Sequence, residues 1–542
     1  MNNALYTYPL PDNEPVFEYL KGSKERTDLD KEIKRQENNE IEIPLIINGK
    51  EVFTGDTGKV RSPHKHSNVL ATYHMAGAKE VKMAIEAANK AHQQWANLPW
   101  TIRASIMLKA AELISSRYRA LVNASTMLGQ SKNIYQSEID AVCETIDFLK
   151  YNVAFAGNIY EKQPRSSANQ LNRMEYRALE GFIFAVSPFN FTSISANLNT
   201  APAMMGNTTV WKPATTSLLS NYYMMKILME AGLPDGVINF IPGKGSLIGG
   251  EVLSSADMAG VHFTGSNATF NSLWSQVAEN LSMYKSYPRL VGETGGKDFI
   301  FAHPSAVPEE LAYNAIRGAF EYQGQKCSAA SRMYVPESIW PATKKLMTDI
   351  ASEIKVGDVN DPMNFMNAVI DESAFDSIVS YIEYARNSND AEIISGGSYD
   401  KSTGYFIDPT IIVTSDPKFK TMEEEIFGPV LTIFVYKDRD MDETIELCNT
   451  TSPFGLTGAV FSQDRIAASR ICNKLRYAAG NFYINDKPTG AVVGLQPFGG
   501  SRASGTNDKA GGVFNLIRWV SPRTIKETFV PLREYRYPYM MD

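Results

Sequence analysis

The chain has 542 residues, of which 44% are hydrophobic and 21% are charged, and its formal net charge is −7. This length is enough for several globular domains, and the acidic balance argues against a general nucleic-acid-binding protein, which would carry a basic surplus. The four cysteines are scattered and show no CxxC spacing, so they predict neither a disulfide framework nor a zinc site. We expect a protein of a reducing compartment.

The start of the chain shows no targeting pattern. Residues 1–20 carry acidic side chains and lack the basic start or Arg-rich composition of a signal or presequence, and no apolar run reaches the roughly 18 residues that cross a bilayer. We therefore expect no membrane partner and a cytoplasmic location, or the mitochondrial matrix if a presequence has been removed. Residues 21–40 mix charges of both signs and predict a solvated helix. Residues 41–52 predict strands with a turn at Asn48 and Gly49.

The middle of the chain changes from a helical to an alternating pattern. From about 78 to 160, apolar residues recur at three- and four-residue spacing, which is typical of helices. From 181 onward, wholly apolar runs such as GFIFAVSP, TTVWKP and GVHFTGS alternate with helix-compatible stretches, which predicts parallel βαβ units in a doubly wound sheet. A second alternating stretch from about 298 predicts a second α/β domain. The glycine-rich segment 485–512 is long enough to indicate a functional loop.

One cysteine stands in a pattern that favours reactivity. Cys327 lies in YQGQKCSAASR beside Lys326, and a cationic neighbour near a helix start favours the thiolate. Cys143, Cys448 and Cys472 lie in apolar-periodic stretches and are expected to be small buried hydrophobic residues. The local pattern alone leaves a structural role for Cys327 open as well.

Two further segments have a functional and a structural interpretation. Glu293, at the end of a predicted strand and before two glycines, could act as a general base if burial raised its pKa, or could cap a turn. The segment 264–269 follows a strand and begins a helix, so its N–H groups could bind a phosphate. It lacks the full GxGxxG pattern, which leaves an ordinary strand-to-helix turn open.

Seven short motifs, taken in their order along the chain, resemble those of the aldehyde dehydrogenase superfamily. They are SPFNF (187–191), WKP (211–213), FTGS (263–266), GETGGK (292–297), GQKCS (324–328), EEIFGPV (424–430) and PFGG (497–500). The segments 320–332, 478–490 and 496–512 are similar to the branch that oxidises L-glutamate γ-semialdehyde to L-glutamate in proline catabolism. Oxidation of another short semialdehyde, and a catalytically silent homologue that keeps the fold, are the alternatives.

The resemblance implies an α/β fold of three parts. A Rossmann-type dinucleotide-binding domain is expected over 1–162 and 183–290, and a catalytic α/β domain over 291–490. A small β oligomerisation element is expected from a protruding hairpin at 163–182 together with 515–542. Strand edges of this kind pair between subunits, so a homodimer or an assembly of dimers is expected.

The resemblance also implies a role for each matching residue. Cys327 would attack the aldehyde, Asn190 would hold the oxyanion, and Glu293 would activate the water that hydrolyses the thioester. NAD would be bound by Ser187, Lys212, Gly265, Ser266, Asn267, Ala268, Thr269, Glu425 and Phe427. The small-molecule substrate would be bound by Ser328, Gly490, Ala491, Phe191 and Phe498, and no metal is implied.

The chain departs from its relatives at two of these positions. Thr215 stands where many relatives carry a carboxylate that discriminates against a 2′-phosphate, so rejection of NADP does not follow from the sequence. Ala491 stands where the branch often has serine, so the substrate carboxylate would be held there by backbone N–H alone. Lys326 and Glu144 are expected to pair near the site.

Overall fold

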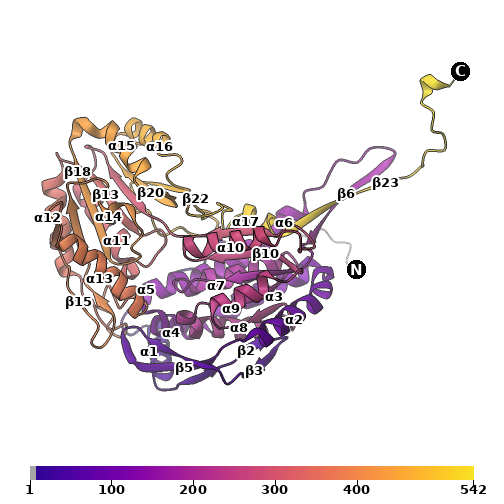
Figure 1. The fold of residues 1–542 in the computed structure, drawn as a ribbon, viewed down its shortest axis with the longest axis horizontal. Helices are drawn as coiled ribbons and strands as arrows, with labels where there is room; N and C mark the ends of the chain where they lie inside the picture. Colours follow the sequence, from indigo (N-terminus) through magenta and orange to yellow (C-terminus); the bar gives the residue numbers. More distant parts are fainter. Residues whose placement is uncertain (1–7, 542) are drawn as a thin grey trace.

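Uninterrupted apolar runs form the central strands of two sheets, each covered by helices on both faces (Figure 1). The computed structural model describes residues 8–541. The first sheet has seven strands in the order β11-β10-β7-β8-β9-β2-β3. Their bounds are β2 Leu45–Ile47, β3 Lys50–Val52, β7 Phe182–Val186, β8 Thr208–Lys212, β9 Ile238–Phe240, β10 Met258–Thr264 and β11 Arg289–Glu293. Strands β7 to β11 are parallel, which confirms the predicted doubly wound sheet.

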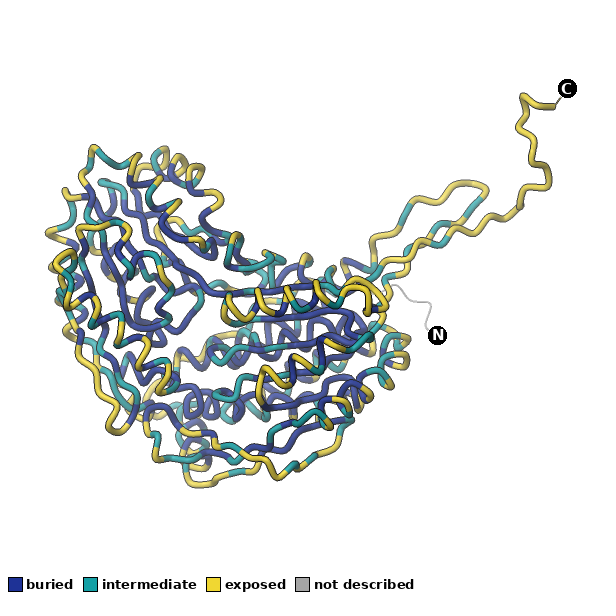
Figure 2. The backbone as a smooth tube through the Cα atoms, in the orientation of Figure 1, coloured by how far each residue is buried: buried dark blue, intermediate teal, exposed yellow. Residues whose placement is uncertain are grey.

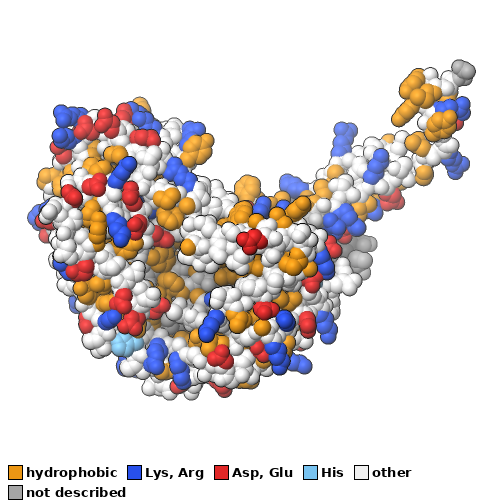
Figure 3. Space-filling view, viewed as in Figure 1, with side chains coloured by type: hydrophobic (Ala, Val, Ile, Leu, Met, Phe, Trp, Pro, Cys, Tyr) orange, Lys and Arg blue, Asp and Glu red, His pale blue; other side chains and the backbone are white. Residues whose placement is uncertain are grey.

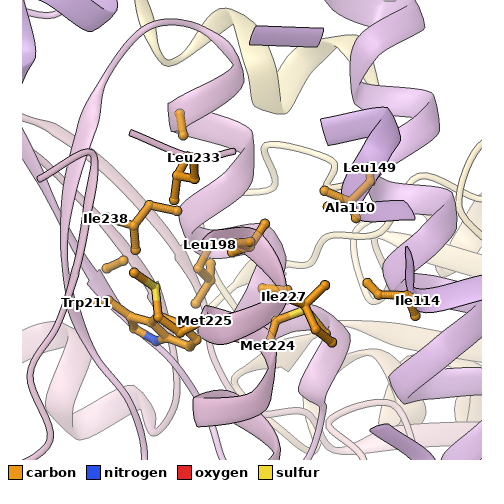
Figure 4. Close-up of a cluster of buried hydrophobic side chains, with 14 of the residues drawn as sticks. Ala110, Ile114, Leu149, Leu198, Trp211, Met224, Met225, Ile227, Leu233 and Ile238 are labelled. Carbon is orange, nitrogen blue, oxygen red and sulfur yellow. The ribbon is translucent and has the colours of Figure 1, made fainter. Parts of the chain in front are cut away.

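Helices cover both faces of the first sheet. One face carries α3 (Trp100–Ser115), α4 (Arg119–Gln130), α6 (Thr145–Tyr160), α7 (Thr192–Met204) and α8 (Leu218–Glu230). The other carries α2 (Ala78–Asn97), α9 (Gly245–Leu253) and α10 (Asn267–Glu279). Figure 4 shows the first of these cores, where the fully buried indole of Trp211 from β8 lies beside Leu198 and Met225. This burial keeps the sheet rigid beneath its functional edge.

The second sheet also has seven strands, in the order β14-β17-β18-β13-β12-β20-β21, all parallel except β14. The strands are β12 Asp298–Ala302, β13 Ala330–Pro336, β14 Ala391–Ser395, β17 Thr410–Thr414, β18 Val430–Tyr436, β20 Thr457–Phe461 and β21 Asn481–Ile484. One face packs on α11 (Pro308–Phe320) and α12 (Trp340–Glu353), and the other on α13 (Glu372–Arg386), α15 (Met441–Thr450) and α16 (Arg465–Lys474). Each sheet forms one lobe with the helices that cover it, and Figure 3 shows a hollow in the surface between the two lobes.

The smaller elements lie outside the two seven-stranded sheets and the helices that cover them. They are α1 Lys24–Glu37, β1 Ile41–Ile43, β4 Thr57–Ser62, β5 Lys65–His74, α5 Ile134–Ser137, the π-helix η1 Glu138–Glu144, the 3-10 turns η2 Thr215–Ser217, η3 Glu321–Gly324, η4 Asp438–Asp440 and η5 Pro538–Met540, β15 Tyr399–Asp400, β16 Phe406–Ile407, α14 Lys420–Glu423, β19 Phe454–Gly455, β22 Ser501–Arg502 and α17 Val513–Ile517. Among residues 8–541, no helix is both long and apolar enough to cross a membrane.

Several local predictions can be compared with these elements. The predicted turn at Asn48 and Gly49 is confirmed, since both residues have positive φ and join the antiparallel strands β2 and β3. The helix predicted over 21–40 forms as α1 but is not wholly solvated, because Leu29 and Ile33 are buried. Strand β11 extends to Glu293 in the first sheet, three residues beyond the predicted domain boundary at 290.

A two-stranded ribbon projects from the body (Figures 1 and 2). The hairpin predicted within 163–182 is wrong, because that segment supplies only β6 (Gln170–Ala178). Its partner is β23 (Val520–Thr528), which pairs with it in antiparallel register along its whole length. Side chains along β6 alternate between exposed and half-buried, as expected for a ribbon with water on one face.

The segment 13–19, named here the N-terminal strap, has no regular secondary structure but is bound to the helices by buried polar contacts. The Arg119 guanidinium of α4 donates to Glu14 at 2.9 Å and also to Glu138 of the π-helix. The hydroxyl of Tyr19 donates to the same Glu138 carboxylate at 2.8 Å. The Arg119 and Glu138 side chains are 7% and 0% exposed, so both charges depend on each other for compensation.

Replacing Arg119 should therefore strongly destabilise the fold. Arg119→Ala leaves the Glu138 carboxylate buried without its cation, and we expect the free energy of unfolding to fall by about 3–5 kcal/mol. Arg117→Ala is the matched control, because Arg117 pairs with Glu230 at the surface and such pairs contribute under about 1 kcal/mol. Urea unfolding followed by circular dichroism measures both. Equal effects of the two variants would contradict the importance of the buried pair.

Candidate active site

The parallel strands of the first sheet have their carboxyl ends next to one another at the same edge of the sheet. The register pairs Val186 with Lys212 and Thr264 with Glu293. Ligands of doubly wound sheets bind outside such strand ends. The predicted cofactor residues Ser187, Lys212, Gly265 and Ser266 all lie at or directly after these ends.

The helix that follows β10 presents its N-terminus at this edge. Ser266 is the N-cap of α10, and its hydroxyl accepts a hydrogen bond from the N–H of Thr269 at 3.2 Å. Asn267 opens the helix and donates from its amide to the carbonyl of Ala503 at 2.8 Å. The dipole of a helix and its first N–H groups, here including Ala268, favour an anionic group such as a pyrophosphate. The Lys212 side chain also lies here, and burial lowers its pKa.

Cys327 lies in the turn between η3 and β13, where the backbone is tightly folded. Tyr322 and Gln323 both have φ near +50°. The side-chain amide of Asn190 donates to the carbonyl of Gln325 at 3.1 Å, which brings this amide beside the cysteine loop. On the other side, a Cβ at Gly296 would lie 2.4 Å from the carbonyl oxygen of Cys327. The GETGGK segment can therefore approach the nucleophile only with glycine there.

The surroundings of Cys327 disfavour a free thiolate. Burial raises its pKa well above the ordinary thiol value, and the nearby carboxylates of Asp298, Glu293, Glu425 and Glu144 act in the same direction. The arrangement keeps the thiol protonated in the structure as it stands. Deprotonation must be coupled to a base or to binding of a cationic group.

The surroundings of Glu293 suit its predicted role as the base that activates the hydrolytic water. It accepts a hydrogen bond from the N–H of Gly500 at 3.0 Å. Burial raises its pKa well above the ordinary carboxyl value, and this hydrogen bond opposes the rise. A Cβ at Gly499 would lie 3.0 Å from the Glu293 carboxylate, so the PFGG glycines allow the loop to close over it. The loop 485–512, predicted to be functional, thus contacts the predicted base directly.

Glu425 lies on the opposite side of the GETGGK segment. Its carboxylate accepts the N–H of Gly296 at 2.8 Å, and burial raises its pKa to about 7. Phe427 has a φ of 56°, and its ring meets that of Phe189 edge-on at a centroid distance of 5.8 Å. A non-glycine residue in this conformation is strained and is tolerated where the surrounding structure holds it.

Two of the predicted substrate residues, Ser328 and Gly490, lie at one buried hydroxyl pair. Ser328 and Thr489 bond through their side chains at 2.8 Å, and both are buried. Gly490 follows with a φ of 94°, which favours glycine. Sequence reasoning missed Thr489, although its position directly before the predicted Gly490–Ala491 turn was a usable signal. The main chain of Phe498 pairs with Ala510 across the same loop.

A buried ion pair contacts the start of α7, which follows directly after Asn190, the residue predicted to hold the oxyanion. The Asp140 carboxylate of the π-helix accepts from Lys132 at 2.6 Å and from the N–H groups of Thr192 and Ser193 at 3.2 and 3.1 Å. These N–H groups begin α7, directly after Asn190 and Phe191. The Lys132 ammonium also lies 4.2 Å from the centre of the Phe191 ring. Nothing in the sequence pattern singled out this pair.

The expected pair between Lys326 and Glu144 is not the contact that forms. Lys326 bonds instead to Glu321 at 3.1 Å, which stands in the η3 turn of the same loop. Glu144 accepts from the hydroxyl of Ser193 at 2.8 Å, and burial followed by the neighbouring Asp140 raises its pKa to about 8. Within residues 8–541, no three His, Cys, Asp or Glu side chains gather as metal ligands would.

Comparisons with known proteins agree with this geometry. Residues 53–525 match the aldehyde dehydrogenase family. The chain is 52% identical over 537 residues to the mitochondrial delta-1-pyrroline-5-carboxylate dehydrogenase of Dictyostelium discoideum, covering 98% of this chain and 96% of the relative. It is 48% identical over 529 residues to the human mitochondrial protein of the same name, covering 97% and 94%.

A solved structure is equally similar. The crystal structure of the delta-pyrroline-5-carboxylate dehydrogenase from Mycobacterium tuberculosis bound with NAD superposes with a TM-score of 0.96 at 48% identity, over 100% of both chains. The family match over residues 53–525 and the identity to these relatives show that the chain belongs to the aldehyde dehydrogenase family.

Proposed function

We propose that this chain is an NAD-dependent dehydrogenase that oxidises L-glutamate γ-semialdehyde, the open form of Δ1-pyrroline-5-carboxylate, to L-glutamate. The observation that carries the proposal is the convergence of Cys327, the Asn190 amide and the buried Glu293 beside a turn at Gly490. The names of the relatives, and the NAD in the similar crystal structure, support the same reaction. Activity on the semialdehyde with NAD, and its loss in Cys327→Ala, tests it.

The first step is addition. The thiol proton of Cys327 passes to water, Sγ bonds to the aldehyde carbon, and the electron pair of the carbonyl π bond moves to the oxygen, which becomes an oxyanion. The Asn190 amide and the N–H of Cys327 stabilise this charge, a contribution of about 3 kcal/mol for one such donor in a dry site. The Asp140 and Lys132 pair holds the start of α7 and so acts on Asn190 as a positioning pair.

The second step is oxidation and release. NAD, when bound, accepts the hydride that converts the thiohemiacetal into a thioester. The strand edge and the α10 N-terminus fit a dinucleotide, with Ser187, Lys212, Ser266 and Glu425 as the residues that would hold it. Glu293 then takes a proton from water, which attacks the thioester carbon and releases the acid and the Cys327 thiolate.

Substrate selection rests on the carboxylate at the far end of the semialdehyde. The turn at Gly490 and Ala491, together with Ser328, offers backbone N–H groups and a hydroxyl to it. Phe191 and Phe498 would flank its aliphatic part. A preference in kcat/KM for succinate semialdehyde over the glutamate compound would contradict this assignment.

We also propose an assembly of at least two chains. In the described part of the chain, the ribbon of β6 and β23 pairs with no other strand. The side chains of Gln163 and Ser166 bond to backbone groups along the outer edge of β6, so the outer edge of β23 is the one more open to a further strand. Beyond it, Leu532 and Tyr535 are 94% and 88% exposed, which is typical of surfaces covered by a partner. The three-part division belongs to this proposal, with the end of the dinucleotide-binding part moved from 290 to the end of β11 at Glu293. We also propose a location in the cytoplasm or, as for the relatives named mitochondrial, in the matrix.

Glu293→Gln should separate the two chemical steps. The variant keeps the size of the side chain but cannot accept a proton, so hydride transfer proceeds while hydrolysis is slow. Stopped-flow absorbance should show a burst of about one NADH per active site followed by turnover reduced roughly 10²–10⁴-fold, the range of a general base. Cys327→Ala, the comparison variant, should show no burst. Normal steady turnover in Glu293→Gln would contradict the role of this carboxylate.

The raised pKa of Glu293 predicts the pH dependence of turnover. The base must be deprotonated, and a pKa above the ordinary carboxyl value means that activity is lost on acidification at a higher pH than an ordinary glutamate would allow. The rate of deacylation should thus rise with pH over a range that lies above the ordinary carboxyl titration. Single-turnover measurements of acyl hydrolysis at a series of pH values give this dependence of the deacylation rate on pH. A rate that stays level down to the ordinary carboxyl range would be inconsistent with a desolvated base.

The ribbon predicts the oligomeric state. At micromolar concentration, multi-angle light scattering should give a dimer or an even multiple of the 60.1 kDa chain. Placing proline at Ile525, in the middle of β23, removes an N–H and should shift the population toward monomer. A monomeric wild-type protein would refute the assembly without affecting the proposed reaction.

A further inference from the structure

The N-terminal strap lies against the π-helix and α6. The carboxylate of Asp147, near the start of α6, accepts the backbone N–H of Glu14 and the side-chain amide of Asn13, both at 2.8 Å. Further along the strap, the Tyr19 hydroxyl bonds to Glu138 of the π-helix. These contacts join residues more than a hundred positions apart, so the strap is part of the fold that supports the site.

Asn13 also contacts a segment outside the π-helix and α6. Its side-chain amide donates to the carbonyl of Val493 at 2.8 Å as well as to Asp147. Its amide oxygen accepts from the Tyr151 hydroxyl at 3.3 Å. Both amide hydrogens and the amide oxygen are therefore used, which fixes the orientation of the side chain.

Val493 belongs to the loop that carries the proposed carboxylate turn. The Val493 side chain is 5% exposed and packs on Phe148 and Tyr151 of α6. At the next position, a Cβ on Gly494 would lie 2.1 Å from the Tyr151 ring, so the loop lies directly on this helix. Only a short segment separates this anchor point from Gly490.

We propose that Asn13 is a positioning residue for the substrate carboxylate, acting through the Val493 carbonyl on the turn at Gly490 and Ala491. This inference rests on the proposed function, because it assigns that turn to the carboxylate. The amide ties the loop to Asp147 and so to α6, at a point outside the reacting atoms. Asn13 thereby contributes to the discrimination between an aldehyde with a distal carboxylate and a neutral one.

Asn13→Ala tests the proposal through substrate selectivity. The variant loses the hydrogen bond to the loop, and we expect KM for L-glutamate γ-semialdehyde to rise about tenfold, the order that a single hydrogen bond supports. The values of kcat, of KM for NAD, and of kcat/KM for propanal should stay within about twofold, because none depends on the carboxylate turn. Glu18→Ala is the matched control, since Glu18 is an exposed residue of the same strap.

Two further variants test the proposal even if Asn13→Ala does not fold. Asn13→Asp keeps the size of the side chain but loses both donated hydrogen bonds, and should raise KM at least as much. Tyr151→Phe removes only the bond to the amide oxygen of Asn13 and should raise it less. An unchanged KM for the semialdehyde in the folded variants, or an equal loss with propanal, overturns the proposal. A wild-type protein without preference for the semialdehyde over propanal would instead refute the proposed function itself.

Discussion

The Asp140 carboxylate is the contact on which the geometry of the site depends. It stands inside the protein and accepts hydrogen bonds from the Lys132 ammonium, from the hydroxyl of Ser193 and from the first N–H groups of α7. A buried charge is stable only when such partners surround it. Asp140 belongs to the π-helix, and its partners come from the turn between α4 and α5 and from α7. The carboxylate therefore locks three elements together at the point where Asn190 leaves the sheet edge.

The same region concentrates negative charge around the nucleophile. Asp298 is buried close to Cys327 and its pKa is raised to about 8 by burial, against the hydrogen bonds from Thr457 that lower it. Glu425 and Glu144 have pKa values of about 7 and 8, each raised first of all by burial. Several of these groups therefore hold protons near neutrality, which limits the repulsion that an anionic intermediate on Cys327 would meet. A dry site can stabilise an oxyanion strongly only because it is not already filled with ionised carboxylates.

Sequence patterns predicted the parts of this molecule that depend on local chemistry. The βαβ periodicity, the turn at Asn48 and Gly49, and the strand, turn and helix at Gly265 follow from neighbouring residues, and the structure has all three. The partner of Lys326 was predicted wrongly, because a side chain of that reach has several carboxylates within its range and only packing selects Glu321. The role of Asp140 and the contacts of Asn13 join distant segments, and no single-sequence spacing records such contacts.

The pairing of β6 with β23 has a consequence for the order in which the chain can fold. These strands join residues 170–178 to residues 520–528, and the contact between Asn13 and Val493 spans a still longer stretch of chain, 480 positions. The domains of a nascent chain form from the N-terminus onward, and contacts of high sequence separation close last. A ribosome-bound intermediate can thus complete most of the first sheet while the ribbon lacks a strand and the strap lacks its loop. The turn at Gly490 and Ala491 can therefore gain its support from Asn13 only after the C-terminal part of the chain has been synthesised.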